Sequence, residues 1–180
     1  MRPQLNSGTL GRPQAVAFLM SPRLIYPEPE PALVARLVPL AERLNELAEV
    51  AADCSLELAE FNAIAGTTID QPFEFHFAGT CTAQAFVRDQ LARKHVQEFR
   101  ALQDDDLLEL LGTIQTGARP HEAPFWLEVL ELNLPQAPVS DLIFYPADAL
   151  ASLGIDGDTE LEPDAILRIA RAASRPPILL

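Results

Sequence analysis

The stretch LVARLVPLAERLNELAEVA (33–51) decides the fold class, because its leucines recur at alternating steps of four and three residues. That spacing puts Leu37 and Leu44 on one side of a helix and charged residues such as Glu42 on the other. Pro39 interrupts the pattern, so the helix either kinks there or ends just before it and a second helix begins. The segment predicts an amphipathic helix with one buried face.

Apolar residues follow helical spacing in later segments as well. The expected helices cover 56–65 (capped by Ser55 and closed by Gly66), 83–95 (capped by Thr80 or Thr82), 107–114, 125–134 and 164–174 (with Pro163 at its first position). The side chains that these patterns place in the core are Leu37, Leu44, Phe61, Phe86, Trp126 and Leu130.

We therefore predict a mainly α protein, in which residues 32–180 form a single compact helical domain. Residues 1–31 precede it as a proline-rich N-terminal arm or edge strand plus connector. Three short apolar stretches, 15–20, 73–77 and 142–145, leave a few strands possible, and with them an α+β fold. The third of these is either a strand or a tight apolar corner.

The charge is strongly negative and unevenly distributed. The net charge is -13, from 26 acidic and 13 basic side chains. Residues 1–50 carry five of each sign, whereas residues 101–150 carry nine acids and one base, Arg119. Such a chain repels phosphate backbones and anionic lipid, which argues against nucleic acid and membrane as partners. It favours a basic protein surface as partner, with simple solubility as the alternative explanation.

Seven acids in this segment are the candidate partner-binding residues. Three aspartates at 104–106 would also stabilise the start of a helix through its macrodipole, which by itself is a sufficient structural explanation for them. The full set is Asp104, Asp105, Asp106, Glu109, Glu122, Glu128 and Glu131.

Reactive residue types crowd together only in FEFHFAGTCTAQAFV (73–87). A cysteine nucleophile needs a base within hydrogen-bond reach, and His76 lies five residues before Cys81 across a glycine-containing turn. No nucleophile elbow or other catalytic context surrounds Cys81. We favour a structural interpretation, in which the phenylalanines are core and both Cys81 and Cys54 are buried, reduced and unpaired.

Metal and cofactor motifs are missing from the sequence. His76, His95 and His121 are widely separated, without an HExxH pattern or paired cysteines. DGDTELE (156–162) alternates acids like a calcium loop, but leucines occupy the loop positions that require glycine and glutamate. The glycines form neither a phosphate-binding loop nor a dinucleotide fingerprint. We predict no metal and no cofactor.

Compartment follows from hydropathy and composition. No apolar run approaches the roughly 18 residues of a membrane span, and the first twenty residues lack a signal-peptide cleavage site. Twelve of the thirteen bases are arginine, a bias typical of GC-rich bacterial genomes. The sequence predicts a cytoplasmic bacterial protein and leaves its oligomeric state open.

The layout of residues 55–180 resembles that of small bacterial immunity proteins, which neutralise a toxin domain delivered between competing cells. The resemblance lies in LAEFNAIAGTTI (58–69), TAQAFVRDQLA (82–92), SDLIFYPADAL (140–150) and LEPDAILRIARAASRPPILL (161–180). It implies a non-enzymatic protein that binds a cognate, often basic, toxin domain tightly. An acidic protein suits that role, because it can occupy the positive substrate groove of a nuclease toxin.

We predict an immunity or inhibitor protein on these grounds. Two alternatives from other classes remain: a small hydrolase or transferase that uses Cys81 and His76, and a phage- or secretion-related structural or assembly subunit whose acidity is incidental.

Overall fold

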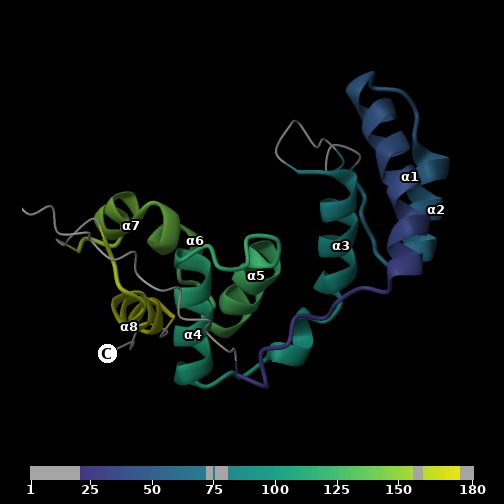
Figure 1. Ribbon diagram of the computed structural model, residues 1–180. Helices are drawn as coiled ribbons and strands as arrows, with labels where there is room; N and C mark the ends of the chain where they lie inside the picture. The colour runs from purple at the N-terminus through teal and green to yellow at the C-terminus, as the bar shows by residue number, and fades with distance from the viewer. Residues whose placement is uncertain (1–20, 72–74, 76–80, 156–159, 175–180) are drawn as a thin grey trace, which may run out of the picture.

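The computed structural model describes residues 21–71, 75, 81–155 and 160–174, and within them the protein is helical, with no strand. The mainly α prediction is confirmed. Figure 1 shows α1–α3 gathered at one end of the molecule and α4–α8 at the other. The helices are α1 (Pro31–Glu49), α2 (Ser55–Ala65), α3 (Ala83–Arg93), the 3-10 helix η2 (Val96–Phe99), α4 (Asp104–Gln115), α5 (Ala123–Asn133), α6 (Val139–Phe144), α7 (Pro146–Ser152) and α8 (Pro163–Ala173).

Helix α1 is continuous through Pro39, which settles the choice between one helix and two. Proline tolerates an interior position here because its ring lies on the exposed side of the helix. The buried face includes Leu37, Leu44 and Leu47, as the leucine spacing predicts. The predicted stripe ends one turn early, since Ala51 lies beyond the helix, is exposed and has a positive φ of 50°.

The ends of α2 and α3 test the predicted caps. Ser55 is the first residue of α2 and not its cap: the Asp53 carboxylate accepts hydrogen bonds from the Ser55 amide (3.0 Å) and hydroxyl (2.6 Å). The predicted cap was wrong by one residue, because the Asp53 carboxylate accepts from the Ser55 amide and the helix already begins at Ser55. Gly66 closes α2 in the left-handed conformation (φ 68°), and Thr82 caps α3 by accepting from the Ala85 amide, both as predicted.

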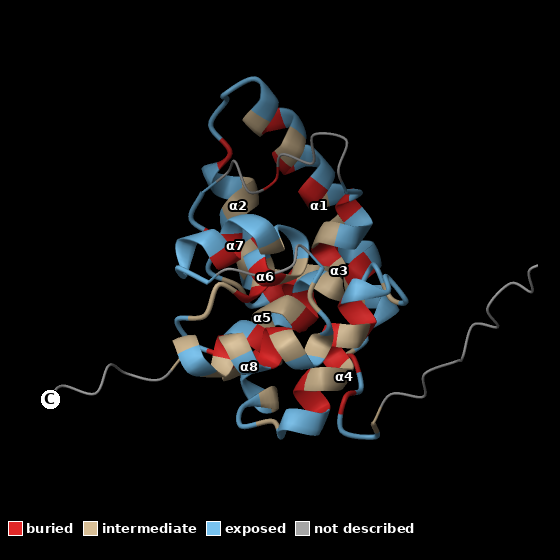
Figure 2. Cartoon of the chain, turned by 90° about the vertical axis from the view of Figure 1, so that its left-hand side faces the viewer, coloured by how far each residue is buried: buried red, intermediate tan, exposed pale blue. Residues whose placement is uncertain are grey.

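Two hydrophobic clusters hold the helices together. In the first, α1 packs against α2 and α3, around Phe61 and Phe75, whose rings meet edge to face with centroids 5.1 Å apart. Helix α3 belongs to both clusters, because Val87 and Leu91 lie in the first and Ala92 lies in the second. Figure 2 shows the buried residues along the sides of the helices that face one another. The shared helix joins the two clusters into one domain.

The second cluster is built around Trp126 and Phe125 of α5. Phe99 and Tyr26 contact both rings edge to face, at interplanar angles of 66–88° and with centroids 5.2–6.4 Å apart. Such pairs contribute about 0.5–1.5 kcal/mol each beyond burial. Tyr26 belongs to the segment that runs along this cluster toward α1, and burial raises the pKa of its hydroxyl to about 12. Leu24 and Tyr26, which precede α1, therefore belong to the core.

The strand predictions resolve in part. Residues 15–20 lie outside the described residues, as do 73–77 except for Phe75, which is buried. Residues 142–144 complete α6, and α7 begins after Tyr145, so a strand there is wrong and the tight apolar corner is right. Pro146 favours this outcome, because it lacks the N–H that a strand needs and fits the first turn of a helix.

Five of the six predicted core side chains are fully buried, and Phe86 is only half-buried. Its ring lies at the edge of the first cluster, 4.9 Å from the Phe75 ring by centroid. Cys54 is buried and unpaired as expected. Cys81 is unpaired but exposed, so its predicted burial is wrong. It lies just before Thr82, the cap of α3, and therefore does not belong to the apolar face of the helix.

Candidate partner-binding surface

The aspartates that begin α4 have three different environments. Asp104 forms an exposed ion pair with Arg171 of α8, at 2.7 Å. Asp106 is buried and its carboxylate accepts a hydrogen bond from the Gln103 amide at 3.3 Å. Asp105 is exposed and has no hydrogen bond or ion pair within the described part of the chain. All three complement the positive end of the helix dipole, but only Asp105 is wholly available to a partner.

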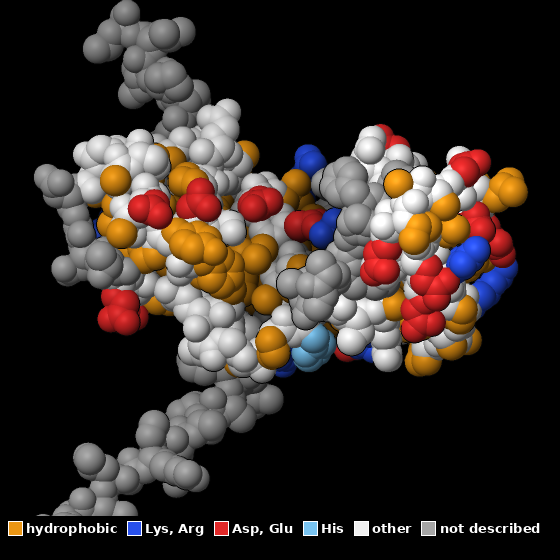
Figure 3. Space-filling model, turned by 90° about the horizontal axis from the view of Figure 1, so that it is seen from above, with side chains coloured by type: hydrophobic (Ala, Val, Ile, Leu, Met, Phe, Trp, Pro, Cys, Tyr) orange, Lys and Arg blue, Asp and Glu red, His pale blue; other side chains and the backbone are white. Residues whose placement is uncertain are grey.

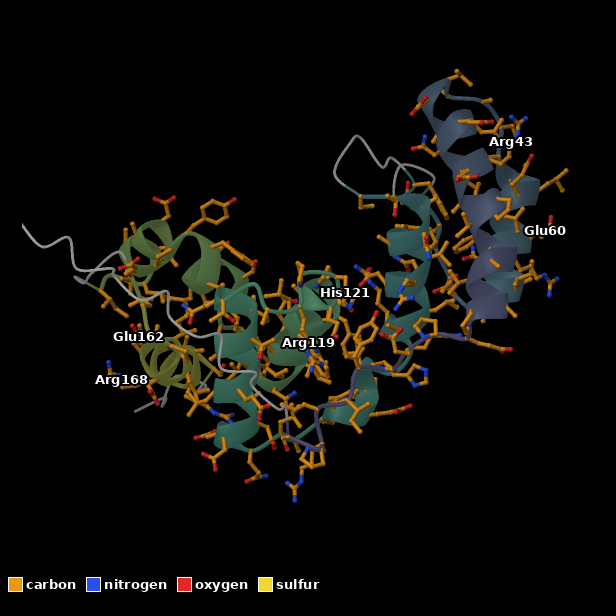
Figure 4. All side chains as sticks on the ribbon, viewed as in Figure 1. Arg43, Glu60, Arg119, His121, Glu162 and Arg168 are labelled. Atoms are coloured by element: carbon orange, nitrogen blue, oxygen red, sulfur yellow. The ribbon has the colours of Figure 1, made fainter. Side chains whose placement is uncertain are left out.

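A groove of about 650 Å³ runs between α4 and α8 beside Asp104. Its charged lining alternates in sign, with Asp164 and Asp104 next to Arg168 and Arg171. The two arginines weaken the negative field of Asp104, and Figure 4 shows Arg168 directed outward from α8. The groove is thus less negative than the sequence of α4 suggests.

Glu109 ties the N-terminal segment to α4. Its carboxylate accepts a hydrogen bond from the Ser21 amide at 2.7 Å, across 88 residues of sequence. A hydrogen bond to a charged acceptor is worth about 1.5–3 kcal/mol when it is protected from water. Glu109 is half-buried, so it combines a structural contact with partial access to the surface.

Glu122 lies beneath the surface and holds Trp126 in place. The indole Nε1–H donates to its carboxylate at 2.8 Å. Arg119 Nη1 lies 3.4 Å and His121 Nε2 lies 3.6 Å from the same carboxylate. Figure 4 shows Arg119 and His121 close to α5. A buried carboxylate needs such partners, and the Glu122 side chain, which is only 7% exposed, has three of them.

Glu128 belongs to a three-residue charge bridge between α3 and α5. Arg93 Nε lies 2.9 Å from Glu128 and 2.9 Å from Asp89. Burial raises the pKa of both carboxyls, and the Arg93 charge offsets part of that rise. The bridge connects the two ends of the molecule, because α3 packs with α1 and α5 packs with α4.

The structure therefore separates the seven predicted acids by availability. Glu131 is exposed and, like Asp105, has no ion pair among the described residues. Asp104, Glu109 and Glu128 are accessible in part and already have partners, while Asp106 and Glu122 are buried. Sequence reasoning could not foresee these partners, because they lie 67 residues away for Asp104 and 88 for Glu109.

A surface that sequence reasoning missed lies over α6 and α7. Phe144 and Tyr145 are 50% and 64% exposed, and Leu153 and Ile155 are 37% and 41% exposed. The exposed acids Asp141 and Asp148 belong to the same two helices. Figure 3 shows hydrophobic side chains gathered over this end of the molecule with acidic side chains among them. We call these six residues the α6–α7 surface.

Two signals in the sequence point to this surface. The aromatic residues Phe144 and Tyr145 directly precede Pro146, at a corner of the chain where side chains are less easily buried. In addition, residues 120–167 contain ten acids and no lysine or arginine, the longest such interval in the chain. The apolar run within SDLIFYP (140–146) does not by itself indicate whether its side chains are buried or exposed.

The residues of the alternative catalytic site are only partly described. Cys81 is exposed beside α3, and His76 lies outside the described residues. His95 contacts Glu98 at 2.8 Å. Within the described ranges, no group of three or more histidine, cysteine or acidic side chains is arranged to hold a metal. None of the helices in those ranges combines the length and apolar character needed to cross a bilayer.

Comparison with protein-family models, with curated proteins and with solved structures found no match to this chain.

Proposed function

We propose that this chain is an acidic, non-enzymatic binding protein that neutralises a cognate basic toxin domain, in the manner of bacterial immunity proteins. One observation carries the proposal. Residues 120–167 contain ten acids without a lysine or arginine, and Glu131, Asp141 and Asp148 among them are exposed. A surface with one sign of charge and few internal ion pairs attracts a partner of the opposite sign.

Solubility alone explains this pattern less well. Acids spread evenly over the molecule keep a protein soluble equally well, whereas one-sided charge creates a directed field. That field extends about 8–10 Å at physiological salt, so it acts chiefly on partners already near the surface. It disfavours nucleic acid and anionic lipid, which leaves a basic protein as the matching partner.

The partner-binding residues that we propose are the seven acids of the two helix regions. Asp105 and Glu131 act most directly, and Asp104, Glu109 and Glu128 contribute through their accessible oxygens. Asp106 and Glu122 are buried and contribute indirectly: Asp106 stabilises the start of α4, and Glu122 holds Trp126 in place. The proposed place of action is the bacterial cytoplasm, where an immunity protein protects the cell that makes it.

Co-expression tests the proposal. The product of the adjacent gene, expressed in a laboratory bacterium, should stop growth when it is alone and be tolerated when this chain is present. The two proteins should copurify at low salt, and the copurified partner should be basic. A Cys81→Ala variant should protect equally well.

Three results would contradict the proposal. They are a neighbour that is harmless alone, toxicity that persists with this chain, and protection that disappears in Cys81→Ala. The last of these would favour a Cys/His-dependent hydrolase or transferase. A harmless neighbour that nevertheless forms a stable assembly with the chain would favour a structural or assembly subunit.

A further inference from the structure

The α6–α7 surface is unusual because four large apolar side chains are exposed within two short helices and the turn that follows them, and Figure 3 shows hydrophobic side chains gathered at this end. Single exposed apolar residues are ordinary, but a contiguous apolar patch on a folded protein marks an interaction site. Aromatic residues are enriched at interfaces, where they supply much of the binding energy. Phe144 and Tyr145 together are the largest exposed aromatic feature of the described chain.

The backbone holds this aromatic pair in a fixed position. The Tyr145 amide donates to the Asp141 carbonyl at 2.7 Å and closes α6, while the Tyr145 carbonyl accepts from the Ala149 amide at 3.0 Å and opens α7. Buried Leu142 and Leu150 anchor the two helices to the second cluster. Binding through Tyr145 would therefore order little backbone, which lowers the entropic cost of association.

The far end of α7 is equally well defined. The Ile155 amide donates to the Leu150 carbonyl at 2.9 Å, and the Gly154 amide donates to the Ala151 carbonyl at 3.1 Å. Gly154 has a φ of 69°, so these bonds form a Schellman motif that requires the left-handed conformation. Leu153 and Ile155 flank this glycine and are presented by the motif.

Charge limits what can cover the surface. Asp141 and Asp148 are exposed within it, and no lysine or arginine occurs in residues 120–167 to neutralise them. A second copy of the chain in a symmetric dimer would bring like charges together, which is unfavourable. An apolar segment flanked by arginine or lysine satisfies both features, because its apolar side chains cover the patch and its bases meet the aspartates.

We infer that the α6–α7 surface is the anchoring site for a basic amphipathic segment of the partner protein. This inference rests on the proposed function and deepens it: the acids of α4 and α5 attract the basic partner, and the α6–α7 surface retains it. Attraction governs the association rate, whereas apolar anchoring governs the dissociation rate. The two roles can therefore be separated by experiment.

A synthetic peptide tests the anchor without knowledge of the partner. The probe is an 18-residue peptide of leucine and lysine, with leucine at helical spacing, titrated into the full chain at low and physiological salt. It should bind and should protect the amides of 139–155 from hydrogen exchange. Two reference peptides serve as controls. One has the same composition in scrambled order, and the other has glutamate in place of every lysine. Both should bind at least about tenfold more weakly.

Variants locate the binding. The double change Phe144→Ser and Tyr145→Ser should weaken the basic peptide at least about tenfold, mainly through faster dissociation. The matched control is Val50→Ser with Leu56→Ser, which alters exposed apolar residues of the α1–α2 end and should leave affinity unchanged. Thermal unfolding of both variants checks that the fold is intact. If the first double variant unfolds, the double change Tyr145→Ser with Asp148→Asn replaces it.

Several outcomes would overturn the inference. These are equal binding of the acidic peptide, equal loss in both double variants, and a wild-type dimer in sedimentation that Phe144→Ser with Tyr145→Ser converts to a monomer. Failure here is distinguishable from failure of the proposed function. A toxin neighbour that is neutralised equally well by the Phe144/Tyr145 variant would refute only the anchor, whereas peptide binding without any toxic neighbour would refute only the immunity role.

Discussion

The two ends of the molecule are both built of packed helices, but the balance of acidic and basic residues differs between them. Residues 31–100, which include α1–α3, carry ten acids and six bases, and charged pairs such as Arg43 with Glu46 lie on their solvent side. Residues 120–167, which include α5–α7, carry ten acids and no base. The first arrangement is that of an ordinary solvated helix surface. The second directs charge outward, and this difference indicates where a partner binds.

The cores differ as well. The α1–α3 cluster contains the phenylalanine group Phe61, Phe75 and Phe86, whereas the α4–α8 cluster is centred on Trp126, Phe125 and Tyr26. Helices α6 and α7 pack on the second of these cores through Leu142 and Leu150. If the α4–α8 end is the functional half, changes there should affect partner binding more than matched changes at the α1–α3 end.

The largest effect should come from Trp126→Ala. Removing a fully buried tryptophan typically costs about 3–5 kcal/mol, and here it also leaves buried Glu122 without its indole donor. Urea unfolding of the purified variant measures the loss. Trp126→Phe is the control, since it keeps one aromatic ring while it deletes the donor and part of the indole volume, and it should lose about 1–3 kcal/mol. A loss below about 1 kcal/mol in Trp126→Ala would contradict the central role of this ring.

Leu44→Ala tests the other cluster and should cost about 2–5 kcal/mol. Leu44 is fully buried among α1–α3. Hydrogen exchange should show the greatest loss of protection in α1 and α2, with less in α4 and α5. Leu56→Ala is the matched control, because Leu56 is 84% exposed and its truncation should stay within about 0.5 kcal/mol. Equal loss of protection along the whole chain would mean that the two ends unfold as one unit.

How far the sequence predicts this structure depends on the range of the interaction. The leucine spacing of α1, the Thr82 cap and the Pro163 start of α8 are local features, and all three are confirmed. The half-burial of Phe86 and the exposure of Cys81 depend on which neighbours pack beside them, which no local pattern encodes.

The predicted acids show the same limit more sharply. Their positions along the helices follow from the sequence, but their partners do not. The pairing of Asp104 with Arg171 and of Glu109 with the Ser21 amide is fixed by how α8 and the N-terminal segment pack on α4. The exposed pair Phe144 and Tyr145 is the converse case, since apolar residues normally imply burial and only the corner at Pro146 brings them to the surface.

Charge neutralisation should have an intermediate effect, on kinetics. The triple variant Asp104→Asn, Asp105→Asn, Glu131→Gln should bind the basic partner about tenfold more slowly at low salt, and the deficit should shrink as salt rises. The control triple Glu30→Gln, Glu42→Gln, Glu60→Gln removes the same charge from exposed positions at the α1–α2 end, where Figure 4 shows Glu60. Stopped-flow or surface-based association kinetics compare the two. Equal slowing of association in both triple variants would mean that only the total charge matters, and that the acids of the α4–α8 end have no special role.

The charge bridge between the two ends predicts a smaller, pH-dependent effect. Burial raises the pKa of Asp89 in the folded protein, and Arg93 offsets this only in part. The folded state thus binds the proton more tightly than the unfolded state, so the contribution of Asp89 to stability falls as the pH rises through the interval between the two pKa values. Asp89→Asn removes that fall.

The free energy of unfolding of Asp89→Asn, relative to that of the wild type, should therefore increase between about pH 3 and pH 7, so that the variant becomes relatively more stable as the pH rises. Urea unfolding at several pH values measures the trend, and Asp105→Asn at an exposed site supplies the baseline. The opposite trend would show that the Arg93 interaction outweighs burial and that the bridge stabilises the junction of the two ends in its charged form.

The smallest effect should come from Cys81→Ala, within about 0.5 kcal/mol of the wild type, because the side chain is exposed at the start of α3. Cys54→Ala should cost more, since that thiol is buried in the first cluster. Neither change should alter partner binding, because both residues lie outside the acidic end of the molecule. Melting curves and binding kinetics of the two variants measure this directly. If Cys81→Ala kept its stability and lost all protection against the toxin, the functional residues would lie at the α1–α3 end. That result would contradict a partner-binding role for the acidic α4–α8 end.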